Sequence, residues 1–297
     1  MSVLVLTEKE LRQMVKINAA SINAVSDAFL WLSQGKVTLP PILHIEIPEH
    51  QGDVDVKAAY VKGLDRFAVK IGAGFFQNFK LGLPSSPAMM VVLSAKTGMT
   101  EAILLDNAYL TDVRTAAAGA VADRHLVLEN VFCAGVMGAG SQDRYQMMAL
   151  KQVREFNRLV VYDRDQSLMV AYAGDMAQQL SVEVVAAQTV EEVVVQSQVV
   201  VTCTPSRQPF VDPAFLHPGL HITAMRANLP EKQELMPGVF AKADIIACDV
   251  RSQSFSVGEL FNARSGGIQL DEDQVLELGE IISGKKKQTI PGRDYDL

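Results

Sequence analysis

Long apolar runs and cysteines are scarce in this sequence of 297 residues. No uninterrupted apolar stretch is long enough to span a bilayer, and the charged first ten residues lack the apolar core of a signal peptide. The three cysteines, Cys133, Cys203 and Cys248, lie in or at the end of apolar runs. That position favours buried, reduced thiols over disulfides or zinc ligands. We therefore expect a cytoplasmic protein that has no membrane partner.

Positive charge is also in short supply, because the net charge is −7 and the one basic run is Lys285-Lys286-Lys287. A single short basic run on an acidic chain is typical of a solvated surface turn, so no nucleic-acid partner is expected. The spacing of His50, His125, His217 and His221 does not suggest a metal site. What is present is 48% hydrophobic residues in a chain long enough for two domains.

The most informative stretch is Val131–Gln142, in which an apolar run breaks on a Gly-Ala-Gly turn and a helical pattern follows. This order of strand, turn and helix places backbone N–H groups and a positive helix end against a phosphate. Gly138 allows the tight turn, and Gly140 lets the main chain approach a pyrophosphate. The third position of this dinucleotide fingerprint, normally Gly or Ala, is Asp143, whose charge would weaken cofactor binding unless the side chain turns away.

A second expected strand, Arg158–Tyr162, ends on Asp163, near the spacing at which a carboxylate accepts hydrogen bonds from a ribose diol. The adjacent Arg164 could instead meet a 2′-phosphate, so the cofactor is NAD or NADP. The alternative is an ordinary strand–helix–strand turn in which Asp163 is a solvated loop residue. Further candidate cofactor contacts open the helix or follow later strands: Ser141, Gln142, Thr204, Pro205 and Met225.

Periodicity divides the chain into two parts. Before the glycine turn, runs of strands indicate a mixed α+β unit; the expected strands are 42–47, 56–61, 67–71, 89–93 and 101–105, with a helix at 22–32. After the turn, strands and helices alternate, which predicts an α/β, doubly wound parallel sheet. Its expected later strands are 182–186, 199–203, 221–225 and 245–248, with helical segments at 190–196, 258–263 and 273–283.

Arg114 lies near the start of an alanine-rich segment, Thr111–Leu126, that predicts a helix capped by Thr111 or Asp112. A cation at a helix N-terminus is unfavourable for the dipole. Arg114 therefore either binds an anionic ligand as a bidentate donor or pairs with Asp112 or Asp106.

Three motifs together resemble the ornithine cyclodeaminase/μ-crystallin family over residues 5 to 284. They are Asp112-Val113-Arg114-Thr115-Ala116-Ala117-Ala118, Gly138-Ala139-Gly140-Ser141-Gln142 and Lys232-Gln233-Glu234-Leu235. The segments Leu104-Leu105-Asp106-Asn107 and Gly82-Leu83-Pro84-Ser85 resemble its ectoine-utilisation branch.

The resemblance implies a Rossmann domain inserted into a discontinuous α+β domain that binds substrate and forms a homodimer. The corresponding boundaries are 1–112 for the substrate and dimerisation domain, 113–284 for the dinucleotide-binding domain and 285–297 for a tail. A Gly-rich family segment that returns to the first domain is expected beyond this point and is not seen. The implied cofactor is NAD or NADP, and the implied partner is a small amino or imino acid.

By resemblance, Lys70 matches the family's substrate lysine and Arg114 its carboxylate-binding arginine, while His44 stands in place of a second arginine. Asn228 takes the position of the catalytic aspartate, and an amide is not a base at neutral pH. Lys57 would face the same region as Lys70 if their strands pair.

The resemblance therefore implies an oxidoreductase that reduces an imino acid or oxidises the matching amino acid. The alternatives are a cyclising deaminase acting on a diamino acid, and an inactive homologue that binds a small molecule or peptide.

Overall fold

The computed structural model describes residues 2–227 and 231–285. The chain forms two compact units, the first made of residues 1–16 and 31–114 and the second of residues 17–30 and 115–297. The expected division placed all of residues 1–112 in one domain, whereas residues 17–30 go with the second unit. Two helices contribute residues to both units: α2 (Ala19–Ser33) and α3 (Tyr109–Leu126).

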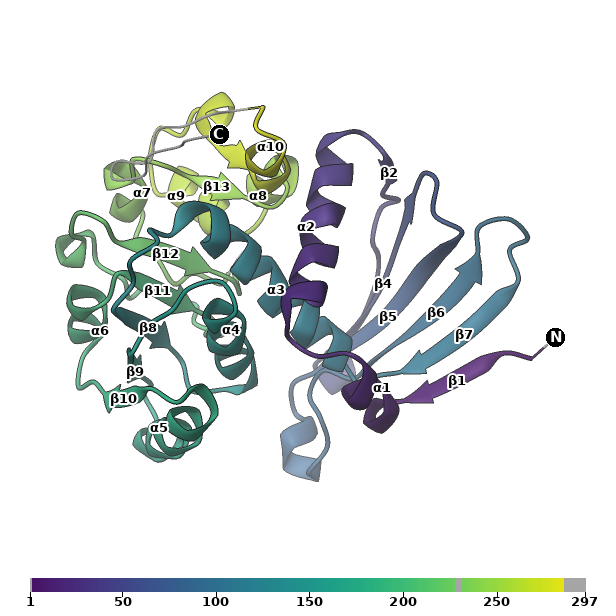
Figure 1. Cartoon of the computed structure of the whole chain (residues 1–297), viewed down its shortest axis with the longest axis horizontal. Coiled ribbons are helices and arrows are strands. Elements are labelled where there is room, and N and C mark those ends of the chain that lie inside the picture. Colours follow the sequence, from purple (N-terminus) through teal and green to yellow (C-terminus); the bar gives the residue numbers. More distant parts are fainter. Residues whose placement is uncertain (1, 228–230, 286–297) are drawn as a thin grey trace. The chain divides into compact units, whose positions relative to one another are not determined.

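The first unit contains a mixed seven-stranded sheet and a short helix (Figure 1). Its strands follow the order β1-β7-β6-β5-β4-β2, with β3 also paired to β4. All of these pairs are antiparallel except β1 with β7. The elements are β1 (Leu4–Thr7), α1 (Glu8–Met14), β2 (Val37–Thr38), β3 (Leu43–Ile47), β4 (Gly52–Val61), β5 (Arg66–Phe75), β6 (Ala88–Ser94) and β7 (Thr100–Leu105). The five strands expected in this part are therefore present.

The second unit contains a five-stranded parallel sheet with strand order β10-β9-β8-β11-β12. The chain starts in the middle strand, moves to one edge and then returns to the other side, which is the doubly wound order of a Rossmann fold. The elements are β8 (Cys133–Met137), α4 (Ser141–Lys151), β9 (Arg158–Tyr162), α5 (Gln166–Leu180), β10 (Glu183–Ala186), α6 (Val190–Gln196), β11 (Val199–Thr202) and β12 (His221–Ala224). The expected fold class is confirmed.

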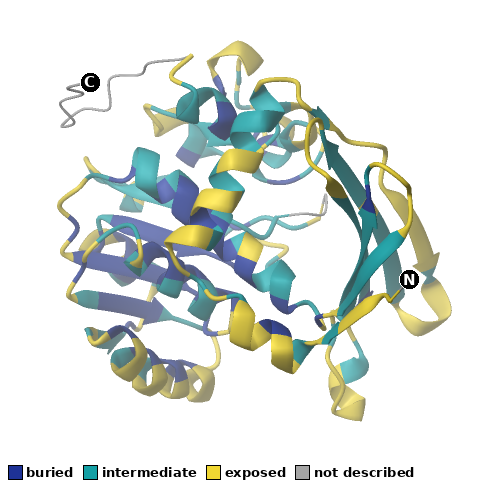
Figure 2. Cartoon of the chain, turned by 45° about the vertical axis from the view of Figure 1, so that its right-hand side comes forward, coloured by how far each residue is buried: buried dark blue, intermediate teal, exposed yellow. Residues whose placement is uncertain are grey.

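Apolar side chains bury both faces of this parallel sheet. Ala134 and Val136 of β8 pack in one cluster with α4 and α5, whereas Cys133 and Met137 pack in the other with α6. Because neighbouring residues of a strand point to opposite faces, such strands read as continuous apolar runs in the sequence. In Figure 2 the central strands of this sheet are dark blue, while the sheet of the first unit is mostly teal and yellow.

The expectation for the last strands was wrong in part. Residues 245–248 were expected to extend the parallel sheet, but β13 (Ala247–Cys248) pairs with β14 (Leu276–Glu277) in a separate two-stranded sheet. The only helix between β12 and β13 in the described residues, α7 (Gly238–Lys242), has five residues. A parallel crossover needs about a dozen residues or more, usually as a full helix. The remaining helices are α8 (Arg251–Ser254), α9 (Glu259–Ser265) and α10 (Leu278–Ile282), so the expected helix at 273–283 is shorter than predicted.

Candidate functional site

One face of the first unit's sheet carries alternating polar side chains. In the strand register, His44 of β3 lies opposite Asp55 of β4, and Lys57 of β4 lies opposite Lys70 of β5. Asp55 and Lys57 are two residues apart in the same strand and therefore share a face. All four side chains thus belong to the same side of the sheet. The strands of Lys57 and Lys70 pair, so Lys57 lies opposite Lys70, which is the condition under which the sequence analysis expected both to face one region.

Lys70 has an unusual environment for an amine. Burial, followed by the positive charges of Arg114 and Lys57, lowers the pKa of Lys70 to about 8. Gly72, two residues further along β5, leaves room for the lysine stem, because a Cβ there would lie 3.1 Å from Lys70 Cε. A partly buried amine with this pKa can donate or accept a proton near neutral pH, as catalytic lysines do.

Asp55 links two of the expected substrate contacts. Its Oδ1 lies 2.8 Å from Nδ1 of His44, and its Oδ2 lies 3.0 Å from Nζ of Lys57. The hydrogen bond with Asp55 raises the pKa of His44, so the imidazolium persists to higher pH. The sequence analysis did not single out Asp55. The signal was available in the alternation Asp53, Asp55, Lys57, which places three charged side chains on one face of a strand.

The start of α3 differs from the expected one. The helix begins at Tyr109, so neither Thr111 nor Asp112 precedes it, and the carboxylate of Asp106 accepts the N–H of Leu110 at 3.0 Å. Arg114 therefore lies in the second turn, where the helix dipole opposes a cation less strongly. Its charge contributes to the lowered pKa of Lys70, so Arg114 and Lys70 act in the same region of this unit.

In the second unit, the glycine turn has the conformation that a phosphate-binding loop requires. Gly138 has a φ of +114° and donates its N–H to the carbonyl of Tyr162 at 2.9 Å. A Cβ on Gly138 would lie 2.5 Å from Oδ1 of Asp143, so only glycine fits there. Gly140 is the N-cap of α4, and Ser141 opens the helix. The first N–H groups of a helix have no intrahelical partner and can bind an anion.

Asp143 turns back under this turn. Its side chain is only 3% exposed, and Oδ2 accepts the N–H of Gly140 at 2.9 Å. Burial raises the pKa of Asp143 to about 7, and the negative charge of Glu234 adds to that effect. A substantial fraction of the carboxyl groups is therefore neutral near pH 7, which weakens the objection that the sequence raised against this residue.

The residues that were expected to meet the ribose lie beside a cavity of about 200 Å³. Oδ2 of Asp163 accepts the N–H of Ala139 at 2.8 Å, so the end of β9 is fixed against the glycine turn. Asp163, expected to bind a ribose diol, and Arg164, expected to bind a 2′-phosphate, both line this cavity. The lining residues are Tyr162, Asp163, Arg164, Gln166, Met169, Ala187 and Gln188. The turn, the helix N-terminus and this cavity together fit a dinucleotide.

The other expected cofactor contacts lie at the same edge of the parallel sheet. Met137, Thr202 and Ala224 are aligned in the register of β8, β11 and β12. The segments that follow these strands, including Gln142, Thr204, Pro205 and Met225, therefore leave from the carboxyl end of the sheet, where ligands bind in such folds. Asn228 lies outside the described residues.

Glu234 fixes one of these segments and was not assigned a role from the sequence. It is fully buried, and its Oε1 accepts both the N–H and the hydroxyl of Thr204 at 2.7 Å. Its Oε2 accepts the hydroxyl of Thr202 at 2.9 Å. Glu259 in turn accepts the N–H of Glu234 at 2.7 Å. The buried carboxyl group of Glu234 and the partly buried one of Glu259 thus hold the loop that follows β11.

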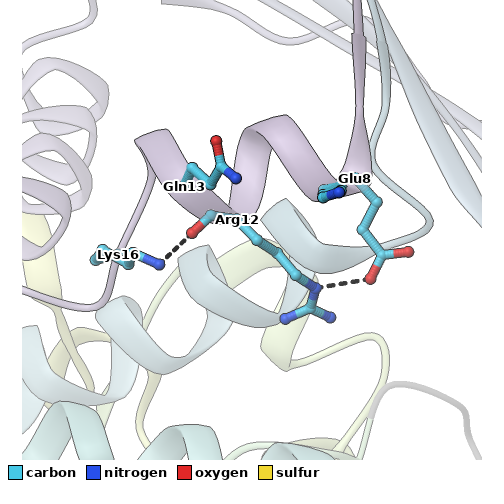
Figure 3. Close-up of a pocket in the computed structure, with 5 residues that line it drawn as sticks. Glu8, Arg12, Gln13 and Lys16 are labelled. Carbon is cyan, nitrogen blue, oxygen red and sulfur yellow. Dashed lines mark hydrogen bonds and ion pairs between the residues drawn. The ribbon is translucent and has the colours of Figure 1, made fainter.

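A second cavity, of about 410 Å³, lies along α1 and is lined by none of the candidate site residues (Figure 3). Arg12 there pairs with Glu8 at 2.7 Å, and Lys16 donates to the carbonyl of Arg12. These side chains already bind one another along an exposed helix, so they do not resemble a substrate site. Among the described residues, no group of His, Cys, Asp and Glu could hold a metal ion, and no helix is long and apolar enough to cross a membrane.

The whole chain is similar to known proteins. Residues 1–296 match the model of the ornithine cyclodeaminase/mu-crystallin family. An uncharacterized cyclodeaminase of Sinorhizobium fredii is 42% identical, over 95% of this chain and 86% of that protein. The alanine dehydrogenase of Archaeoglobus fulgidus is 33% identical, over 100% of this chain and 88% of that protein. Among solved structures, the Thermococcus litoralis delta(1)-pyrroline-2-carboxylate reductase in complex with NADH and L-proline superposes with a TM-score of 0.89. It is 28% identical, covering 96% of this chain and 88% of that chain.

Proposed function

Because the chain belongs to the ornithine cyclodeaminase/mu-crystallin family, we propose that it is an NAD(P)-dependent oxidoreductase that reduces an imino acid or oxidises the matching amino acid. Similarity to an alanine dehydrogenase and to a reductase solved with NADH and L-proline supports this assignment. The glycine turn, Asp163 and the adjacent cavity support a dinucleotide as the cofactor.

One observation carries the substrate class: a cationic group formed by Lys70, Arg114 and Lys57 within the first unit. Three positive charges that act on one another favour the binding of an anion, even though Asp55 pairs with Lys57 and, with Asp106, partly offsets their effect on Lys70. The repulsion is visible in the pKa of Lys70, which burial and these two neighbours lower to about 8. The carboxylate of an amino or imino acid is the anion that such a group fits, and a planar guanidinium binds it bidentately.

A bound reduced nicotinamide supplies the hydride, and the residues of this chain supply binding and protons. Arg114 binds the substrate carboxylate, and Lys70 holds its second oxygen or delivers a proton to the developing amine nitrogen. At neutral pH most Lys70 side chains carry a proton, since the pKa is about 8, and the amine is acidic enough to give it up. In the oxidative direction, the neutral form of Lys70 accepts that proton.

We also propose that the chain forms a homodimer, which the second face of the first unit's sheet supports. Opposite the polar face, the side chains are apolar, and several are about half exposed in the single chain: Val5 50%, Leu43 53%, Ile45 50% and Leu105 45%. An exposed apolar face of this kind marks an interaction surface. A second copy of the chain presents the same face, so a symmetric pair of sheets would bury both faces.

The three free cysteines are compatible with a cytoplasmic location.

The proposal is tested by following the oxidation of NADH and NADPH with a cyclic imino acid, a dicarboxylic imino acid, or pyruvate with ammonia. We expect turnover with one of these, and we expect Lys70→Ala and Arg114→Ala to abolish it while cofactor affinity is retained. Lys62→Ala, which changes an exposed lysine just after β4, serves as the matched control. Turnover that survives both active-site changes would remove the assignment. Release of ammonia from a diamino acid without net cofactor consumption would favour a cyclising deaminase instead.

A further inference from the structure

Asp143 occupies a fingerprint position that normally holds Gly or Ala, and its side chain is placed beneath the phosphate turn. Oδ2 accepts the N–H of Gly140. Oδ1 is buried and has no hydrogen-bond partner among the described residues. Oδ1 lies so close to Gly138 that a Cβ atom on Gly138 would be 2.5 Å from it. A buried carboxylate oxygen without a partner is costly in its charged form, whereas a neutral carboxylic acid is tolerated more easily.

The charged and titratable groups that face Asp143 come from several elements. Glu234, buried beside β11, disfavours a second negative charge, and Arg226 after β12 partly offsets that effect. Tyr172 of α5 and Cys203 after β11 also interact with Asp143, but burial raises the pKa of each well above its usual value, so both stay neutral. The charge of Arg226 thus only partly offsets burial and the charge of Glu234, so a substantial fraction of Asp143 is neutral near pH 7.

We propose that the dinucleotide binds to the form of the protein in which Asp143 is protonated, so that cofactor binding above neutral pH takes up a proton. This inference rests on the proposed NAD(P) site. A diphosphate at the N-terminus of α4 is anionic, and Asp143 lies in the first turn of that helix. An ionised Asp143 would repel the diphosphate.

The neutral acid avoids this repulsion without disturbing the turn. Its carbonyl oxygen still accepts the Gly140 N–H, so Gly138 and Gly140 keep the conformation that the phosphate requires. In this chain, therefore, a titratable group replaces the usual small residue, and the affinity of the site depends on pH. By linkage, the dissociation constant rises up to tenfold per pH unit once the pH exceeds the pKa of Asp143 in the free protein.

Calorimetric titration of the full chain with NADH tests this inference. Runs at pH 6, 7, 8 and 8.5, each in two buffers of different ionisation enthalpy, give both the affinity and the number of protons taken up. NADH is the suitable probe because, unlike NADPH, it has no phosphate monoester that titrates near neutrality. For the wild type we expect uptake near zero at pH 6 and approaching one proton at pH 8.5, with at least tenfold weaker binding at the higher pH.

Three variants isolate the residue. Asp143→Asn keeps the acceptor for Gly140 and removes the titration, and Asp143→Ala restores the usual small residue. Both should bind NADH with less than threefold change in affinity from pH 6 to pH 8.5 and without proton uptake. Asp175→Asn removes a mostly exposed carboxylate that pairs with Arg144 and should behave as the wild type. Lys70→Met, which removes an amine whose pKa is about 8, should also keep the uptake.

The outcomes separate the two proposals. NADH binding that does not depend on pH in the wild type, or proton uptake that persists in both Asp143 variants, would overturn the role of Asp143 and leave the oxidoreductase assignment intact. Absence of binding of both NADH and NADPH at every pH, including pH 6, would overturn both. Circular dichroism of each variant shows whether it has folded before its titration is interpreted.

Discussion

At the scale of single residues, the ionisation of Lys70 depends on side chains from different elements. Burial has the largest effect on its pKa, and the charges of Arg114 and Lys57 lower it further, while Asp106 and Asp55 act in the opposite direction. The sequence placed Lys70 on a strand, but its pKa follows from the strand register, which brings Lys57 directly opposite. A sequence without a known register cannot provide that neighbour.

Replacement of Lys57 tests this coupling. Lys57→Met removes a positive charge opposite Lys70, so the pKa of Lys70 should rise from about 8 toward the usual value for lysine. Under the proposed function, the pH at which the reductive kcat/KM declines should move upward by several tenths of a pH unit. The measurement is a pH–rate profile at saturating cofactor, with Lys62→Met as the matched control. An unchanged profile would show that Lys57 does not influence the titrating group.

At the scale of elements, patterns of apolar residues predicted most of the fold. Strand β9 at Arg158–Tyr162 and helix α6 at Val190–Gln196 agree residue for residue with the expectation, because both are bounded by clear polar or turn residues. The start of α3 was missed because its capping group, Asp106, is separated from the helix by two residues with positive φ, Asn107 and Ala108. Such a backbone conformation is uncommon for residues other than glycine, and the sequence gives little sign of it.

The same limit applies to the candidate site. The glycine turn could be identified from residue types at fixed spacing, whereas Lys70 was singled out only by the resemblance to a family. The roles of Asp55 and Glu234 could not, because each depends on hydrogen bonds to residues that are distant in the chain or in a neighbouring strand. Polar side chains of this kind become recognisable only when the pairing is known.

At this scale we predict that Asp106 stabilises the fold by capping α3. Asp106→Ala removes the acceptor of the Leu110 N–H and should lower the free energy of unfolding by about 1 kcal/mol, the usual cost of losing such a cap. Asp106→Asn retains an acceptor and should cost less. Thr111→Val changes the residue that the sequence favoured as the cap, and the structure predicts a small effect. Urea unfolding of the three variants checks this order. A larger loss for Thr111→Val than for Asp106→Ala would contradict it.

At the scale of the whole molecule, the apolar face of the first unit's sheet predicts association. Ile45 projects from β3 on the face opposite His44 and is half exposed in the single chain. Ile45→Lys should place a charge in the proposed homodimer contact and shift the chain from dimer to monomer in analytical ultracentrifugation. Glu46→Lys, on the neighbouring residue and the polar face, is the matched control and should leave the dimer intact. A monomeric wild type would rule out this contact.

The free energy of unfolding of the whole chain should also depend on pH, because buried acids are neutral in the fold. Burial raises the pKa of Asp123, Asp143 and Glu259 to about 7 each, above the values expected for the unfolded chain. A raised pKa stabilises the fold fully below the unfolded value, near pH 4, and that stabilisation is lost as the pH rises to about 7. His221 opposes the trend, since burial lowers its pKa to about 4 and its neutral form costs stability below the usual histidine pKa.

Asp123→Asn tests one of these contributions together with its neighbour His221, whose Nε2 lies 3.6 Å from Oδ1 of Asp123. The amide can still accept the hydroxyl of Thr223 that Asp123 accepts at 2.8 Å. The change removes an acid that ionises more readily in the unfolded chain, so the variant should gain stability relative to the wild type as the pH rises. Each pKa unit corresponds to about 1.4 kcal/mol, which gives a relative gain of a few kcal/mol between pH 4.5 and pH 8. Urea unfolding at those two pH values measures it. A difference between variant and wild type that stays constant across this range would mean that Asp123 is already ionised in the folded protein.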